Sequence, residues 1–136
     1  MRRTASRRRF ERARLACEIG LAYLRARREL RTAPIGHAVA QLRDTRSAEE
    51  TSPDAVEQAR RLARAVVRML PLLPGDTRCL TRSLVLSALL ARRGIASRLV
   101  IAARPGPPFL AHAWVECGEI AVLEPGDESF ARLAEL

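Results

Sequence analysis

Residues in the second half of the chain are of the types that build a hydrolytic site: Cys79, His112 and an acidic residue beyond it. A cysteine thiolate is a nucleophile, a histidine can take its proton near neutral pH, and a carboxylate can orient the imidazole. The order cysteine, histidine, acid is the order of papain-like enzymes. Glu124 is the preferred acid and Asp127 the alternative. These residue types predict acyl transfer through a thioester.

The place of Cys79 in its helix favours a reactive thiol. A helix is expected from about Arg78 to Arg93, with Asp76 or Thr77 as its N-cap, so Cys79 falls in the first turn. Unpaired N–H groups and the helix dipole stabilise a negative charge there, and Arg78 and Arg82 add positive charge. The backbone N–H of Cys79 can also contribute to an oxyanion hole.

A predicted hairpin that turns about Gly118 brings the histidine and the acid together. With Gly118 at the tip, His112 lies opposite Glu124, and side chains that oppose each other directly share a face with Cβ atoms about 5 Å apart. The same register pairs Glu116 with Ile120 and Trp114 with Val122, and directs Ala113, Val115, Ala121 and Leu123 to the other face. A shift of one residue would put Glu124 on the wrong face, and Asp127 would then be the substitute.

The remaining cysteines are Cys17 and Cys117, which give an odd total of 3 without paired spacing. Free thiols in a reducing compartment are therefore expected. Cys17 lies beside an apolar helical stripe and is interpreted as a packing residue. No CxxC motif occurs, and the only histidines are His112 and His37, which is interpreted as a surface or packing residue. No metal site is expected, and the predicted chemistry needs no cofactor.

Two helices are expected ahead of the one that carries Cys79. The first covers about Phe10 to Leu30 and has an apolar stripe at Leu15, Ile19, Ala22, Ala26 and Leu30. The second starts at the capping residue Ser52, with Pro53 and Asp54 in its first turn, and runs to about Leu70. It should bury Val56, Leu62, Val66 and Met69.

The third helix should be the buried central one, because apolar residues surround most of it and Gly94 ends it as a C-cap. Strands are expected at 96–103, 111–117 and 119–124. Helices followed by a small antiparallel sheet predict an α+β fold. We expect a single domain over residues 1–136, with a helical part at 1–70 and the catalytic helix and strands at 71–136.

The charge of the chain is strongly basic. The net charge is +9, and all 24 basic residues are arginine. Such a protein attracts acidic peptides, nucleic acid or anionic membranes. A small nucleic-acid-binding module is therefore an alternative, but only five aromatic residues occur and no binding motif is present, so no nucleic-acid partner is expected. No apolar run is long enough to span a membrane, and a cytoplasmic location is expected.

Several short motifs resemble a known family when they are taken as a set. They are Cys79-Leu-Thr-Arg-Ser-Leu84, Arg92-Arg-Gly-Ile95, Arg98-Leu-Val-Ile101, Phe109 and Ala111-His-Ala-Trp-Val-Glu116. This set, within about residues 66–127, resembles the transglutaminase-like leader peptidases of lasso-peptide biosynthesis. The resemblance implies a transglutaminase-like, papain-like fold with Cys79 as nucleophile and His112 as base. The acid usually follows twelve residues after the histidine, which is Glu124; it is often Asp in the family, so Asp127 stays open.

The resemblance also implies a task and partners. Such enzymes remove the leader from a ribosomally made precursor peptide and free the amine of the core peptide for macrolactam formation by a separate ATP-dependent cyclase. Some relatives are fused to a leader-recognition domain. This chain is too short for one, so a separate recognition protein is expected to deliver the precursor. The alternative within the same fold is a hydrolase or acyltransferase that acts on another substrate.

Overall fold

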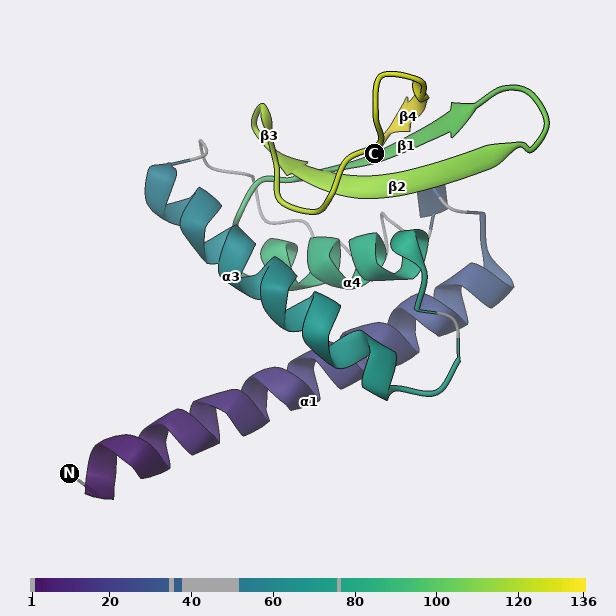
Figure 1. The fold of residues 1–136 in the computed structure, drawn as a ribbon. Helices are drawn as coiled ribbons and strands as arrows, with labels where there is room; N and C mark the ends of the chain where they lie inside the picture. Colours follow the sequence, from purple (N-terminus) through teal and green to yellow (C-terminus); the bar gives the residue numbers. More distant parts are fainter. Residues whose placement is uncertain (1, 35, 38–51, 76) are drawn as a thin grey trace.

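Helices form one side of the molecule and an antiparallel sheet forms the other (Figure 1). The computed structural model describes residues 2–34, 36–37, 52–75 and 77–136. The helices are α1 (Arg2–Thr32), α3 (Pro53–Met69), the 3₁₀ helix η1 (Leu70–Leu72) and α4 (Cys79–Arg92). The strands are β1 (Arg98–Arg104), β2 (Leu110–Cys117), β3 (Ile120–Ala121) and β4 (Ala131–Glu135). The predicted α+β class is confirmed.

Helix α4 is the centre of the fold. It packs against α1 and α3 on one side and against β1 and β2 on the other. Its residues from Ser83 to Leu90 are all buried, as predicted for the central helix. Gly94 adopts a positive φ of 69° just beyond the helix, which is the conformation of a glycine C-cap. The N-cap is Arg78, so the prediction of Thr77 is wrong; Asp76 lies outside the described residues.

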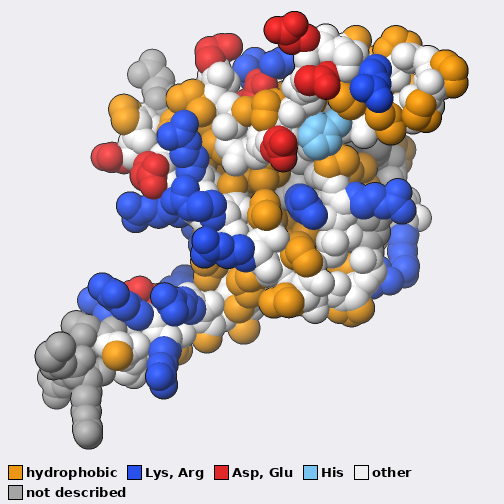
Figure 2. All heavy atoms as spheres, in the orientation of Figure 1, with side chains coloured by type: hydrophobic (Ala, Val, Ile, Leu, Met, Phe, Trp, Pro, Cys, Tyr) orange, Lys and Arg blue, Asp and Glu red, His pale blue; other side chains and the backbone are white. Residues whose placement is uncertain are grey.

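Helix α3 begins where its sequence indicates. The Ser52 side chain accepts a hydrogen bond from the Ala55 N–H, Pro53 occupies the first turn, and Asp54 faces the positive helix end. The buried face consists of Val56, Ala59, Leu62, Ala63 and Val66, whereas Met69 is only partly buried. On the face that Figure 2 shows, basic side chains lie along this helix and along α1.

Helix α1 buries the predicted stripe against α4. Ile19, Ala22 and Ala26 are in the core, and Leu15 and Leu30 pack at its edge. Glu18 fixes the crossing through an ion pair of 2.6 Å to Arg93 at the end of α4. The interpretation of Cys17 as a packing residue is wrong, because its side chain is exposed. No helix in the described ranges is long and apolar enough to cross a membrane.

The sheet has the strand order β3-β2-β1-β4, and all its pairs are antiparallel. Strand β1 pairs with β2 from Arg98↔Glu116 to Arg104↔Leu110. Strand β4 was not predicted; it pairs with β1 around a bulge between Ile101 and Ala102. Its sequence ARLAE contains one large apolar side chain, so no alternation marks it as a strand.

The predicted hairpin register is wrong by one residue. Cys117 pairs with Ile120 and Glu116 with Ala121, because the loop is the two-residue turn Gly118-Glu119 rather than a turn centred on Gly118. Gly118 has a φ of 60° at the loop position where type II′ turns take glycine. The slip puts Ala121 on the Trp114 face and Val122 beside the main core, the reverse of the predicted faces, whereas Leu123 packs on both clusters. The ladder ends at Ala121, so Glu124 is not in a strand.

The sheet face away from α4 is covered by the segment that links β3 and β4. Val100, Ala102 and Trp114 form a second buried cluster, and Leu123 and Phe130 pack on it. This packing places the segment after β3 across the sheet, beside His112. The crossing segment therefore supplies the third side of the cavity described next.

Candidate active site

A small cavity lies between the start of α4 and the sheet. Its volume is about 130 Å³, and its lining residues are Val67, Cys79, Arg82, His112, Ala113, Leu123 and Glu124. Three of these are the residues predicted for catalysis, and they come from α4, from β2 and from the segment after β3. Sequence reasoning missed the apolar members Val67 and Leu123, which carry no chemical signal of their own.

Cys79 is the first residue of α4 and is partly buried. Arg78 is extended at the N-cap and makes no capping hydrogen bond with its side chain. The N-cap side chain therefore does not occupy the backbone N–H groups of the first turn. These groups point out of the N-terminal end of α4, where Cys79 lies. In the loop ahead of this helix, the Pro74 carbonyl accepts a hydrogen bond from the Tyr23 hydroxyl of α1.

His112 lies on β2 opposite Ala102, with its ring between two aromatic rings. The ring centroids are 5.8 Å from Trp114 and 6.0 Å from Phe130. The Nε2 atom lies 2.8 Å from the main-chain carbonyl oxygen of Glu124. A carbonyl oxygen only accepts hydrogen bonds, so Nε2 must carry the proton. In the neutral imidazole this leaves the lone pair on Nδ1.

The two candidate acids have different surroundings. Glu124 lines the cavity with an exposed side chain, and the contact it makes with His112 comes from its carbonyl oxygen. Asp127 does not line the cavity; its carboxylate accepts hydrogen bonds from the backbone N–H and the hydroxyl of Ser129. The Ser129 hydroxyl and N–H lower the pKa of Asp127, and the charge of Arg104 adds to the effect. The Asp127 carboxylate is thus hydrogen-bonded within the turn that contains Ser129.

Arg82 lies one turn beyond Cys79 on α4 and lines the same cavity. Its Nε atom is buried and has no hydrogen-bond partner in the described part of the chain. A guanidinium at this place adds positive charge beside the thiol.

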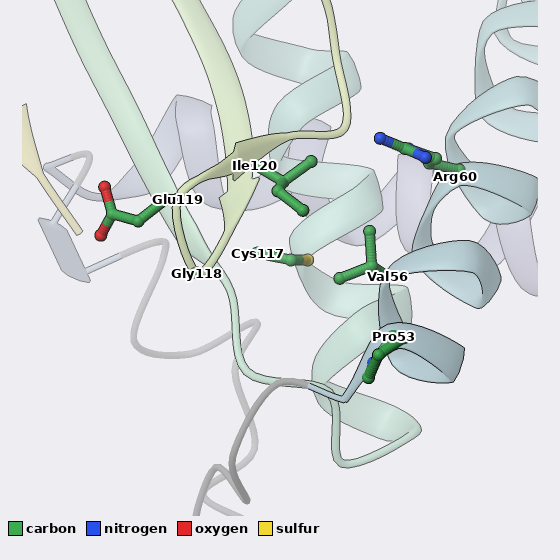
Figure 3. Close-up of a pocket in the computed structure, with 7 residues that line it drawn as sticks. All are labelled: Pro53, Val56, Arg60, Cys117, Gly118, Glu119 and Ile120. Carbon is green, nitrogen blue, oxygen red and sulfur yellow. The ribbon is translucent and has the colours of Figure 1, made fainter.

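A larger cleft, of about 410 Å³, lies at the other end of α3. Figure 3 shows Val56 and Ile120 facing each other across it, with Arg60 at one rim and Glu119 directed away. Cys117 lines its floor and is 1% exposed, and burial raises the pKa of this thiol. Among the described residues, no histidine lines this cleft, so its thiol lacks a base.

Comparison with known families identifies the class of the protein. Residues 20–135 match the Transglutaminase-like superfamily, and the chain belongs to it. This superfamily includes cysteine peptidases and transglutaminases, which use a cysteine nucleophile. Comparisons with curated proteins and with solved structures give no match. The match includes α4 and the whole sheet, and therefore every residue of the cavity.

Proposed function

We propose that this protein is a cysteine peptidase that removes the leader from a ribosomally made lasso-peptide precursor. One observation carries the proposal: Cys79 at a helix start and His112 on a strand line one cavity. Membership of the superfamily supports a thiol-based acyl transfer. The motif set around Cys79 and His112 supports the leader-peptidase task.

The first half of the reaction forms a thioester. Nδ1 of His112 takes the proton of the Cys79 thiol, and the sulfur attacks the scissile carbonyl carbon. The negative charge on the carbonyl oxygen is stabilised by the first-turn N–H groups of α4 and by the positive charge of Arg82. His112 then gives its proton to the leaving amine, which departs as the free N-terminus of the core peptide.

The second half releases the leader. A water molecule gives a proton to Nδ1 of His112, and the resulting hydroxide attacks the thioester carbonyl. The carbon–sulfur bond breaks, Cys79 recovers its proton from His112, and the leader leaves as a carboxylic acid that loses its proton to the solvent. No redox step or cofactor enters this sequence.

Glu124 is the proposed third member of the site, with Asp127 as the alternative acid. The Glu124 carbonyl holds Nε2–H and so fixes the tautomer that leaves Nδ1 free. Its exposed carboxylate can stabilise the imidazolium only through water, which weakens the interaction. Orientation by the main chain is therefore its principal role.

The small size of the cavity supports a separate protein for leader recognition, with this chain cleaving the bond. Its volume of about 130 Å³ holds little more than the residues beside the scissile bond, whereas sites for whole ligands typically measure about 300–1,000 Å³. Recognition of the rest of the leader then falls to a separate recognition protein. The freed amine of the core peptide is the group that an ATP-dependent cyclase would consume.

The proposal is tested by mixing the protein with a precursor peptide and its recognition protein and following leader loss by mass spectrometry. Cleavage should require Cys79, so Cys79→Ala should be inactive while Cys117→Ala, the matched thiol control, stays active. Full cleavage by Cys79→Ala would refute the nucleophile assignment.

The alternative is a transglutaminase-like hydrolase or acyltransferase on another substrate, because the superfamily includes both kinds of enzyme. The same assay separates the cases when a primary amine is added. A leader that ends in a carboxylate indicates hydrolysis, and a leader that ends in an amide of the added amine indicates acyl transfer.

A further inference from the structure

Helix α1 carries a second apolar stripe that the core does not use. Phe10, Leu21 and Leu24 are 71%, 54% and 60% exposed, and Cys17 is exposed between them. We call these four residues the outer stripe. Their successive spacings of 7, 4 and 3 residues are those of helix positions that share one face.

The outer stripe lies opposite the buried stripe of the same helix. At about 100° per residue, its members fall within roughly 60° of the helix circumference, on the side away from Ile19 and Ala26. Together with Arg14 and Arg28, they continue a regular alternation of three and four residues from position 10 to position 28. An alternation of three and four residues is typical of the contact face of a helix that packs along another helix in a coiled coil.

The surroundings of the outer stripe are basic. The arginines that lie within it or along its two edges are Arg7, Arg14, Arg25, Arg28 and Arg31. The same helix carries three acidic residues, Glu11, Glu18 and Glu29. Glu11 pairs with Arg7, Glu18 pairs with Arg14 and Arg93, and the arginines still outnumber the acidic residues. A partner must therefore bring negative charge.

The first turns of α1 project from the body of the protein (Figure 1). Every residue from Ala5 to Arg14 is exposed, so this part has no buried contact with the rest of the described chain. An isolated helix this short is marginal in water, and packing against a partner would stabilise it.

We propose that the outer stripe docks an acidic amphipathic helix of another protein. A second copy of this chain fits poorly, because pairing two outer stripes would bring their arginine flanks together. A membrane surface fits poorly as well, because helices that lie on membranes have a broad apolar face. The proposal goes beyond the peptidase function and stands without it.

The test uses the full-length protein and two synthetic helical peptides of four heptads. Both carry leucine along the contact face; one has glutamate and the other lysine at the flanking positions. Fluorescence anisotropy should show binding of the acidic peptide, and at least about tenfold weaker binding of the basic one. The double variant Leu21→Glu, Leu24→Glu should weaken the acidic complex at least about tenfold, since each leucine loses its apolar burial.

Leu133→Glu is the matched control, because Leu133 is also an exposed leucine, at 66%, but lies on β4. It should leave the affinity within about twofold, as expected of a distant surface site. Cys17 gives a readout inside the outer stripe: the bound acidic peptide should slow its alkylation by iodoacetamide. Circular dichroism verifies that the variants keep their helices.

Each of the following results would overturn the proposal. The acidic peptide fails to bind, or binds no better than the basic one. Binding persists in the double variant, or leaves Cys17 alkylation unchanged. Vesicles of phosphatidylglycerol bind the protein through the outer stripe while the acidic peptide does not, which assigns the stripe to a membrane. The protein forms a dimer that the double variant abolishes, which assigns it to a second copy.

Discussion

A cysteine lies beside a cavity near each end of strand β2, and the two thiols differ in burial and in the charged groups around them. At the Leu110 end, Cys79 starts a helix and shares its cavity with His112 and Arg82. At the other end, Cys117 is buried on the strand itself, and burial raises the pKa of its thiol. The larger cleft belongs to Cys117.

On the proposed assignment of Cys79 as the nucleophile, the smaller of the two cavities is the reactive one. A nucleophilic thiol needs a stabilised negative charge and a base, and of these two cavities the smaller one supplies both. At the Cys117 end, the charged and polar groups form a buried network instead. There the buried Glu116 accepts hydrogen bonds from Trp114 at 2.9 Å and from Arg132 at 2.8 Å, and Arg98 lies 3.3 Å away.

Loss of the base should have the largest effect on activity. His112→Ala should lower kcat for leader cleavage by about 10²–10⁴, the contribution of a positioned general base. Cys117→Ala, at the other end of β2, should change kcat by less than about threefold, since its thiol touches no reacting atom. A similar fall in kcat in His112→Ala and Cys117→Ala would contradict the proposed difference between the two ends of β2. Thermal unfolding controls for the ring contacts that His112 makes with Trp114 and Phe130.

Glu116 should matter for stability rather than for activity. Burial by itself raises the pKa of its carboxyl, but hydrogen bonds from Trp114 and Arg132 and the charges of Arg132 and Arg98 outweigh burial and lower it. A lowered folded-state pKa gives stability that is complete above the unfolded value of about 4.3 and is lost as pH falls through the folded value. Glu116→Gln should therefore cost about 2 kcal/mol at pH 7 and less at acid pH.

Urea unfolding of the wild type and of Glu116→Gln from pH 7 to pH 3 measures this effect. The two free energies of unfolding should converge as the pH falls. A constant difference across that range would mean that the charge of Glu116 does not stabilise the fold.

Cys117→Ala should lower the free energy of unfolding by about 1 kcal/mol, because it removes a buried sulfur from the core. Chemical denaturation measures this loss. A loss of leader cleavage with intact stability would instead place Cys117 in the site.

Glu124→Gln should lower activity far less than His112→Ala, because the variant keeps the carbonyl that holds His112. We expect kcat to fall by less than about tenfold, compared with the larger losses from a missing base. Asp127→Asn, the matched control, should be equally mild, since its carboxylate is bonded to Ser129. If only Asp127→Asn abolishes activity, the acid is Asp127.

The sequence was informative where local signals are strong. The Ser52 cap, the Gly94 C-cap and the apolar periods predicted α3, α4 and the buried side of α1. The hairpin register was not predictable from the apolar pattern alone, because the turn type at Gly118-Glu119 decides it. The Glu124 carbonyl contact follows from the crossing segment after β3, which no residue type signals.

The rate of alkylation of the three cysteines by iodoacetamide, followed by peptide mapping in the folded protein, tests the central claim most directly. Exposure alone would rank Cys17 first, the partly buried Cys79 second and the buried Cys117 last. We predict that Cys79 reacts fastest at pH 7, and that His112→Ala returns it to a place behind Cys17. If Cys17 reacts faster than Cys79 in the wild type, and His112→Ala changes neither rate, Cys79 is not an activated nucleophile.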